Sequence, residues 1–198
     1  ITKDNPWYQG GLYWNSTSLK HYVAGWAIGL LALSLMVGIG WLLGFFNLES
    51  AVYATQFATE NMATNDRTQL VSTFGSWYYS IFLFLVQMLA VGFYEEVMLR
   101  GYLLINLKEG LWWKGISDRK ALIIAVMLSS VLFSLAHLLN PNASFITFIT
   151  ISLAGILLAF PFVWTGNLAL SIGLHSAWNF ILGGVFGFKV SGLSWSAS

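Results

Sequence analysis

Apolar stretches long enough to cross a membrane constrain this chain more than any other feature of its sequence. A helix needs about 20 predominantly apolar residues to span the hydrocarbon core of a bilayer. Five stretches come close to or exceed that length, at residues 21–46, 78–107, 120–139, 144–165 and 167–188. Only 9% of the residues are charged, whereas about a quarter is usual for a soluble domain. We therefore expect an all-α, polytopic transmembrane helix bundle of about five spanning helices.

The connection between the first two spans, residues 47–73, is the most polar one. Its apolar residues follow helical spacing at Ala51, Ala54, Phe57 and Met62, a pattern that is consistent with a short interfacial helix. The sequence contains no internal repeat. Residues 1–198 are therefore expected to form a single membrane domain.

Basic residues predict how the bundle sits in the bilayer. The loop between the second and third spans carries Lys108, Lys114, Arg119 and Lys120, and the positive-inside rule places such a loop in the cytoplasm. Residues 47–73 then lie on the opposite side. The formal net charge of +1 gives no basic excess for nucleic acid, and the absence of cysteine excludes disulfides and thiol nucleophiles. The lipid bilayer is the expected environment.

Three charged side chains interrupt the second span, with apolar sequence on both sides: Glu95, Glu96 and Arg100. Each charge costs about 2.5–3.5 kcal/mol at the centre of a membrane helix. Because Glu96 and Arg100 are four residues apart, they share a helix face, and the simplest interpretation is an internal ion pair. Glu95 points about 100° away around the helix and needs a partner of its own.

Further polar residues lie in two other spans. The third span ends near His137, and the fifth contains His175 and Asn179, four residues apart on one helix face. Taken singly, a histidine at a helix end is more often a capping or interfacial residue, and a His–Asn pair can simply hydrogen-bond two helices. However, with a rise of about 1.5 Å per residue, Glu95, His137 and Asn179 lie about 18–25 Å from the cytoplasmic ends of their spans. Polar groups at one depth in a membrane predict a functional site.

These groups suit the hydrolysis of an amide bond. Glu95 and His137 could share a water molecule and remove its proton as it attacks a carbonyl, while His175 and Asn179 could donate hydrogen bonds to the resulting oxyanion. No serine lies in a Gly-x-Ser-x-Gly elbow. Glutamate and histidine could hold zinc in principle, but the His-Glu-x-x-His pattern is absent and nothing requires an ion. We therefore expect neither a metal nor a cofactor.

Three motifs on separate spans resemble, in their order, those of the CPBP family, the CAAX protease and bacteriocin-processing proteins, also called the Abi family. They are Glu95-Glu96-x-x-x-Arg100, Phe133-x-x-x-His137 and His175-x-x-x-Asn179. The resemblance covers about residues 80–188. It implies an intramembrane glutamic endopeptidase in which the first glutamate and the second-motif histidine activate water, and the third motif stabilises the oxyanion. Glu96, Arg100 and Phe133 would support these groups.

The sequence thus predicts an endopeptidase that cleaves a membrane-associated peptide or protein tail near the cytoplasmic leaflet. Because the family has bacterial members, a bacterial inner membrane is the expected location. The alternative is a non-catalytic membrane subunit, in which the polar cluster pins helices together or binds a membrane-protein partner. A transporter is a weaker alternative, since spans without repeat symmetry do not suggest alternating access.

Overall fold

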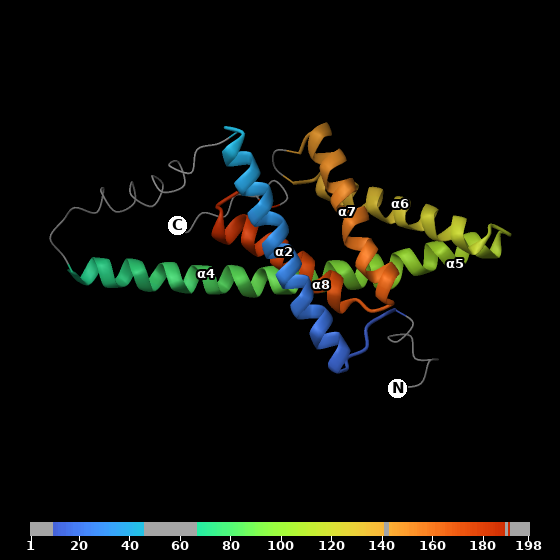
Figure 1. The fold of residues 1–198 in the computed structure, drawn as a ribbon, viewed down its shortest axis with the longest axis horizontal. Helices are drawn as coiled ribbons and strands as arrows, with labels where there is room; N and C mark the ends of the chain where they lie inside the picture. Colours follow the sequence, from blue (N-terminus) through green and yellow to red (C-terminus); the bar gives the residue numbers. More distant parts are fainter. Residues whose placement is uncertain (1–9, 46–66, 141–142, 189, 191–198) are drawn as a thin grey trace.

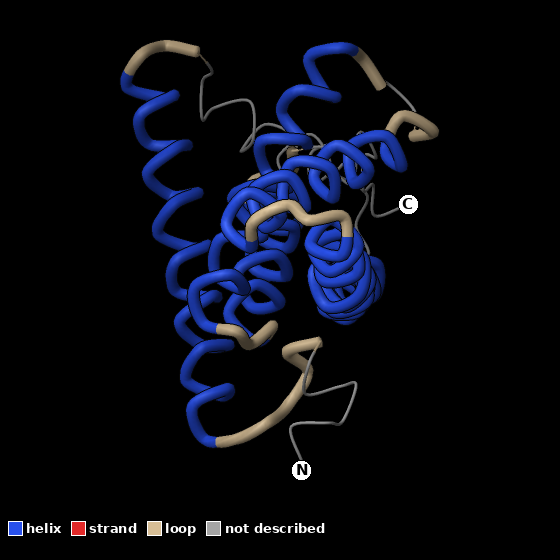
Figure 2. Tube along the Cα trace, turned by 90° about the vertical axis from the view of Figure 1, so that its right-hand side faces the viewer, coloured by secondary structure: helices blue, strands red, loops and turns tan. Residues whose placement is uncertain are grey.

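The computed structural model describes residues 10–45, 67–140, 143–188 and 190. These residues form helices joined by loops and contain no β-strand element, which confirms the all-α fold (Figure 1). In chain order the elements, with η marking a π-helix, are α2 (Ser16–Leu42), α4 (Arg67–Glu96), η1 (Val97–Leu104), α5 (Ile105–Trp113), α6 (Asp118–His137), α7 (Phe145–Thr165), α8 (Ala169–Phe180) and η2 (Ile181–Val185). The helices α4, η1 and α5 follow one another without a break, and Figure 2 shows them viewed along their length.

Four helical segments are long and apolar enough to cross a membrane, and they match the first four predicted spans. They are Ser16–Leu42, Ile81–Trp113, Asp118–His137 and Phe145–Thr165. The interfacial helix predicted around residues 51–62 lies outside the described residues, and the end of that connection, from Arg67, already belongs to α4.

The fifth predicted span, residues 167–188, is shorter in the structure than the sequence suggests. It consists of the 12-residue helix α8 and the five-residue helix η2. Nine of the 12 residues of α8 are buried, because α2, α4 and α7 pack around this helix. Its apolar sequence therefore faces other helices rather than lipid. Among the residues that the structure describes, four segments are long enough to span a membrane, and α8 is a shorter, buried helix.

Glycines allow α2 to approach α8 closely. Gly25 of α2 lies against the backbone of α8, where an added Cβ would come within 2.5 Å of the Leu170 carbonyl oxygen. Gly173 of α8 faces the backbone of Tyr22 in the same way. Small residues at such contacts are typical of helix pairs in membranes. This packing fixes the face that α8 turns towards α4 and α6.

The turn between α7 and α8 places the start of α8. Gly166 ends α7 in the left-handed conformation, with φ of 65°, which a glycine adopts without strain. The side chain of Asn167 then donates to the Tyr13 carbonyl and to the Ser18 hydroxyl, both at 3.0 Å. These bonds tie the turn to the beginning of α2.

Candidate active site

The first motif lies where an α-helix changes into a π-helix. Helix α4 ends at Glu96, and η1 begins at Val97 and contains Arg100. The side chains of Glu96 and Arg100 are buried, with 0% and 1% of their surface exposed. π-Helical turns occur frequently at functional sites. The change in helix type therefore coincides with the charged part of the span.

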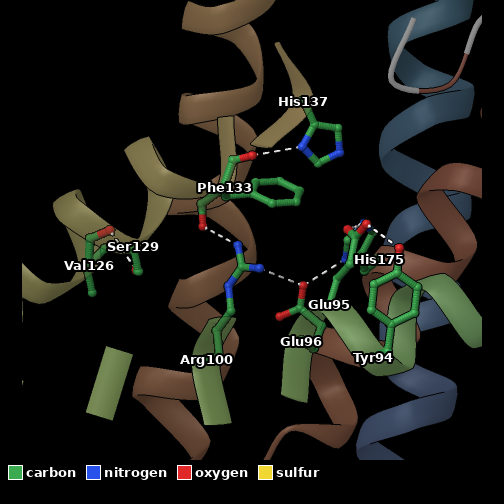
Figure 3. A network of polar contacts seen from close by, with 10 residues as sticks. Tyr94, Glu95, Glu96, Arg100, Val126, Ser129, Phe133, His137 and His175 are labelled. Carbon is green, nitrogen blue, oxygen red and sulfur yellow. Dashed lines mark hydrogen bonds and ion pairs between the residues drawn. The ribbon is translucent and has the colours of Figure 1, made fainter. Parts of the chain in front are cut away.

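Arg100 joins three helices through one guanidinium group. Its Nη1 donates to Glu96 Oε1 at 2.9 Å, which confirms the predicted ion pair, and its Nη2 donates to the carbonyl of Gly155 in α7 at 2.8 Å (Figure 3). The guanidinium carbon also lies 5.2 Å from the ring centre of Phe133 in α6, a distance suited to a cation–π contact. Both terminal nitrogens of Arg100 are therefore engaged, and this end of the site is closed to solvent.

His175 of α8 lies between the two glutamates. Its Nδ1 is 2.7 Å from Glu96 Oε1, and its Nε2 is 3.5 Å from Glu95 Oε2. The imidazole is buried, with 4% of the residue exposed. A single histidine thus links both carboxylates of the first motif to the third motif.

Glu95 has a hydrogen-bond partner separate from the Glu96–Arg100 pair, as its position on another face of the helix requires. Its side chain is 15% exposed, and its Oε1 accepts a hydrogen bond from the hydroxyl of Tyr94 at 3.1 Å. Its other oxygen faces His175. Glu95 therefore lies at the more open end of the cluster, in contrast to Glu96.

His137 is the last residue of α6, as the sequence predicts. Its Nδ1 lies 2.8 Å from the carbonyl oxygen of Phe133. Because a carbonyl only accepts, Nδ1 carries a proton, which leaves Nε2 as the free acceptor of a neutral ring. The Phe133 ring meets both imidazoles edge-on, with centroid distances of 4.5 Å to His137 and 6.1 Å to His175. In Figure 3 this ring lies between Arg100 and His137.

Asn179 lies apart from this chain of contacts. It is buried, with 7% of its surface exposed, one turn beyond His175 on α8. Among the described residues, its side chain makes no hydrogen bond that fixes its direction. The structure therefore connects Glu95, Glu96, Arg100, Phe133, His137 and His175 through successive contacts, and it places Asn179 next to them without a partner.

Two residues that contact the site, Tyr94 and Gly155, were not predicted from the sequence. Tyr94 could have been suspected, because it is a hydroxyl-bearing residue directly before Glu95. Gly155 contributes only its backbone carbonyl, which every residue possesses, so no side-chain pattern could indicate it. Within the described ranges, no three acidic or histidine side chains gather closely enough to hold a metal ion.

Comparison with known protein families supports the motif-based resemblance. The family described as type II CAAX prenyl endopeptidase Rce1-like matches residues 76–181, more than half of the chain. The matched region runs from α4 to the first residue of η2 and includes all three motifs. The chain belongs to this family. The Rce1-like family is a family of CAAX-type membrane proteases, which confirms the resemblance to the CPBP proteins.

Membership of the Rce1-like family and the four apolar helices together identify the chain as an integral membrane protein. No curated protein and no solved structure matches the chain. The roles of individual residues must therefore be argued from the geometry of the cluster.

Proposed function

We propose that the protein is an intramembrane endopeptidase that hydrolyses a peptide bond in the tail of a membrane-associated peptide or protein, near the cytoplasmic leaflet. The observation that carries this proposal is the buried chain of contacts from Glu95 through His175 and Glu96 to Arg100. Ionisable groups within membrane-spanning helices are energetically costly, and they therefore indicate a functional site. Membership of a protease family supports the same conclusion.

In this proposal Glu95 is the general base. It is the more exposed of the two glutamates, so a water molecule can reach it. The free Nε2 of His137 would accept a second hydrogen bond from the same water and orient it. As the water oxygen attacks the carbonyl carbon, one of its protons passes to Glu95. When the C–N bond breaks, that proton passes on to the leaving nitrogen.

His175 would stabilise the oxyanion that forms during this attack. This role requires hydrogen on both ring nitrogens. Nδ1 then donates to Glu96 Oε1, and Nε2, which lies 3.5 Å from Glu95 Oε2, donates to the oxyanion. A donor that is held in place before the reaction is an effective oxyanion partner.

Asn179 would supply the second oxyanion donor. It follows His175 by one helical turn on the same face of α8, and its amide is not engaged by the protein groups described above. Two donors on one rigid helix are held in place before the reaction begins, which is the condition for electrostatic stabilisation of a transition state.

Replacement of Glu95 by glutamine tests the proposed function. A farnesylated CAAX peptide in proteoliposomes is the probe, and its unprenylated form shows whether the lipid is needed. We expect Glu95→Gln to lower kcat by about 10²–10⁴-fold, the usual contribution of a general base. Glu109→Gln is the matched control, because Glu109 is an exposed carboxylate in α5, outside the cluster.

The control variant should cleave at the normal rate, and a chelator should leave that rate unchanged. Full activity of Glu95→Gln would contradict the proposal.

A non-catalytic membrane subunit is the second candidate function. It is favoured by the buried bonds that Arg100 donates to Glu96 and to the Gly155 carbonyl, since polar contacts of this kind can simply hold helices together. A stoichiometric membrane-protein complex after purification, together with no cleavage of any peptide in a library, would support this candidate over the peptidase.

A further inference from the structure

Tyr94 contacts the proposed base and belongs to none of the three motifs. Its hydroxyl donates to Glu95 Oε1 at 3.1 Å. The ring is half-exposed on the outer side of α4, with 53% of the residue accessible. Figure 3 shows the ring beside the helix, with its hydroxyl directed to the Glu95 carboxyl group. A packing role alone would need only the ring and not the hydroxyl.

The hydrogen bond makes the two oxygens of Glu95 different. Oε1 is engaged by Tyr94, whereas Oε2 faces His175 Nε2 across 3.5 Å. A carboxyl group held at one oxygen loses much of its freedom to rotate. This restriction suits a group that must accept a proton from one direction.

We propose that Tyr94 is a positioning residue, which holds Glu95 through Oε1 and so keeps Oε2 as the oxygen that accepts the proton of the water. This inference rests on the proposed function of Glu95 as general base. Tyr94 contacts the base rather than the reacting water, so it acts on the rate through Glu95. The loss of its hydroxyl should then affect turnover and leave substrate binding unchanged.

Tyr94→Phe is the direct test, because it removes the hydroxyl and keeps the ring. We expect kcat for the farnesylated CAAX peptide to fall by about 10- to 100-fold, as is typical for the loss of a hydrogen bond to a charged group. KM and the unfolding temperature should not change. Tyr102→Phe is the matched control: Tyr102 is 64% exposed in η1, and its hydroxyl makes no hydrogen bond to the described residues.

The outcomes separate this inference from the proposed function. A normal kcat in Tyr94→Phe, with Glu95→Gln inactive, would overturn the positioning role and leave the peptidase intact. A raised KM with normal kcat would also overturn it, because Tyr94 would then bind substrate. Activity in Glu95→Gln would instead remove the proposed function, and the role of Tyr94 with it. Equal losses in Tyr94→Phe and Tyr102→Phe would likewise contradict a specific contact with Glu95.

Discussion

Glu95 and Glu96 are neighbours in the chain, yet their surroundings differ in almost every respect. Glu96 has no exposed surface, and its Oε1 accepts from Arg100 at 2.9 Å and contacts His175 at 2.7 Å. Glu95 is partly exposed, and its contacts are longer, at 3.1 Å to Tyr94 and 3.5 Å to His175. The first environment suits a carboxylate that holds helices in place, and the second suits one that works on a substrate.

The difference extends to the two ends of the cluster. At the closed end, which consists of Glu96, Arg100 and the Gly155 carbonyl, short contacts join α4, η1 and α7. At the open end, which consists of Tyr94, Glu95 and His137, the contacts of Glu95 are longer and its side chain is partly exposed. The comparison shows that adjacent identical residues have different surroundings, and we predict different functions for them that substitutions at each end would test.

The largest effect on stability should come from Arg100→Met at the closed end. This change leaves the Glu96 carboxylate buried without its guanidinium, and breaking a buried ion pair by removing one partner costs about 3–5 kcal/mol. Thermal unfolding in detergent would measure the loss. If Arg100→Met unfolded at the normal temperature, the closed end would not be an anchor.

The double variant Glu96→Gln with Arg100→Met sharpens this test. Because it removes both charges, it should recover much of the stability lost in the single variant. No recovery would show that Arg100 stabilises the bundle through packing on Phe133 rather than through its ion pair.

A smaller effect is expected from Gly155→Ala. The added Cβ would lie 2.9 Å from the Cβ of Ser130 and 3.0 Å from its Cα, so α7 would have to move away from α6. Overpacking of this kind costs about 1–3 kcal/mol, and the displaced carbonyl would loosen Arg100. We expect lower stability together with a lower kcat.

Gly38→Ala is the matched control for this prediction, because an added Cβ there has no neighbour within 4 Å. Replacing glycine within a helix by alanine then favours folding by up to about 1 kcal/mol. If Gly155→Ala behaved like Gly38→Ala, the contact between Gly155 and Arg100 would have no influence on the site.

The sequence predicted those features of the structure that depend on residues within one helix. The length of the apolar stretches predicted the first four spans and the position of His137 near a helix end, and helical spacing predicted the Glu96–Arg100 pair. The catalytic roles of Glu95, His137, His175 and Asn179 stay predictions. The cytoplasmic position of the loop around residues 108–120 and the bacterial inner membrane also stay predictions.

Features that depend on distant parts of the chain could not be predicted in this way. The fifth predicted span contains a short helix, α8, that is buried among α2, α4 and α7. An apolar sequence does not indicate whether a helix faces lipid or other helices. The π-helix at Val97–Leu104 has no recognised sequence signal. The link between His175 and both glutamates joins residues about 80 positions apart, so only the folded chain reveals it.

Parallel unfolding and single-turnover measurements on Glu95→Gln and Glu96→Gln test the central claim most directly, namely that Glu95 performs chemistry and Glu96 builds the site. We predict that Glu95→Gln unfolds at the normal temperature or above and does not cleave the peptide. Glu96→Gln should unfold at a lower temperature, because it leaves Arg100 buried without its carboxylate. Normal cleavage by Glu95→Gln, or normal stability of Glu96→Gln, would contradict this division between the two glutamates.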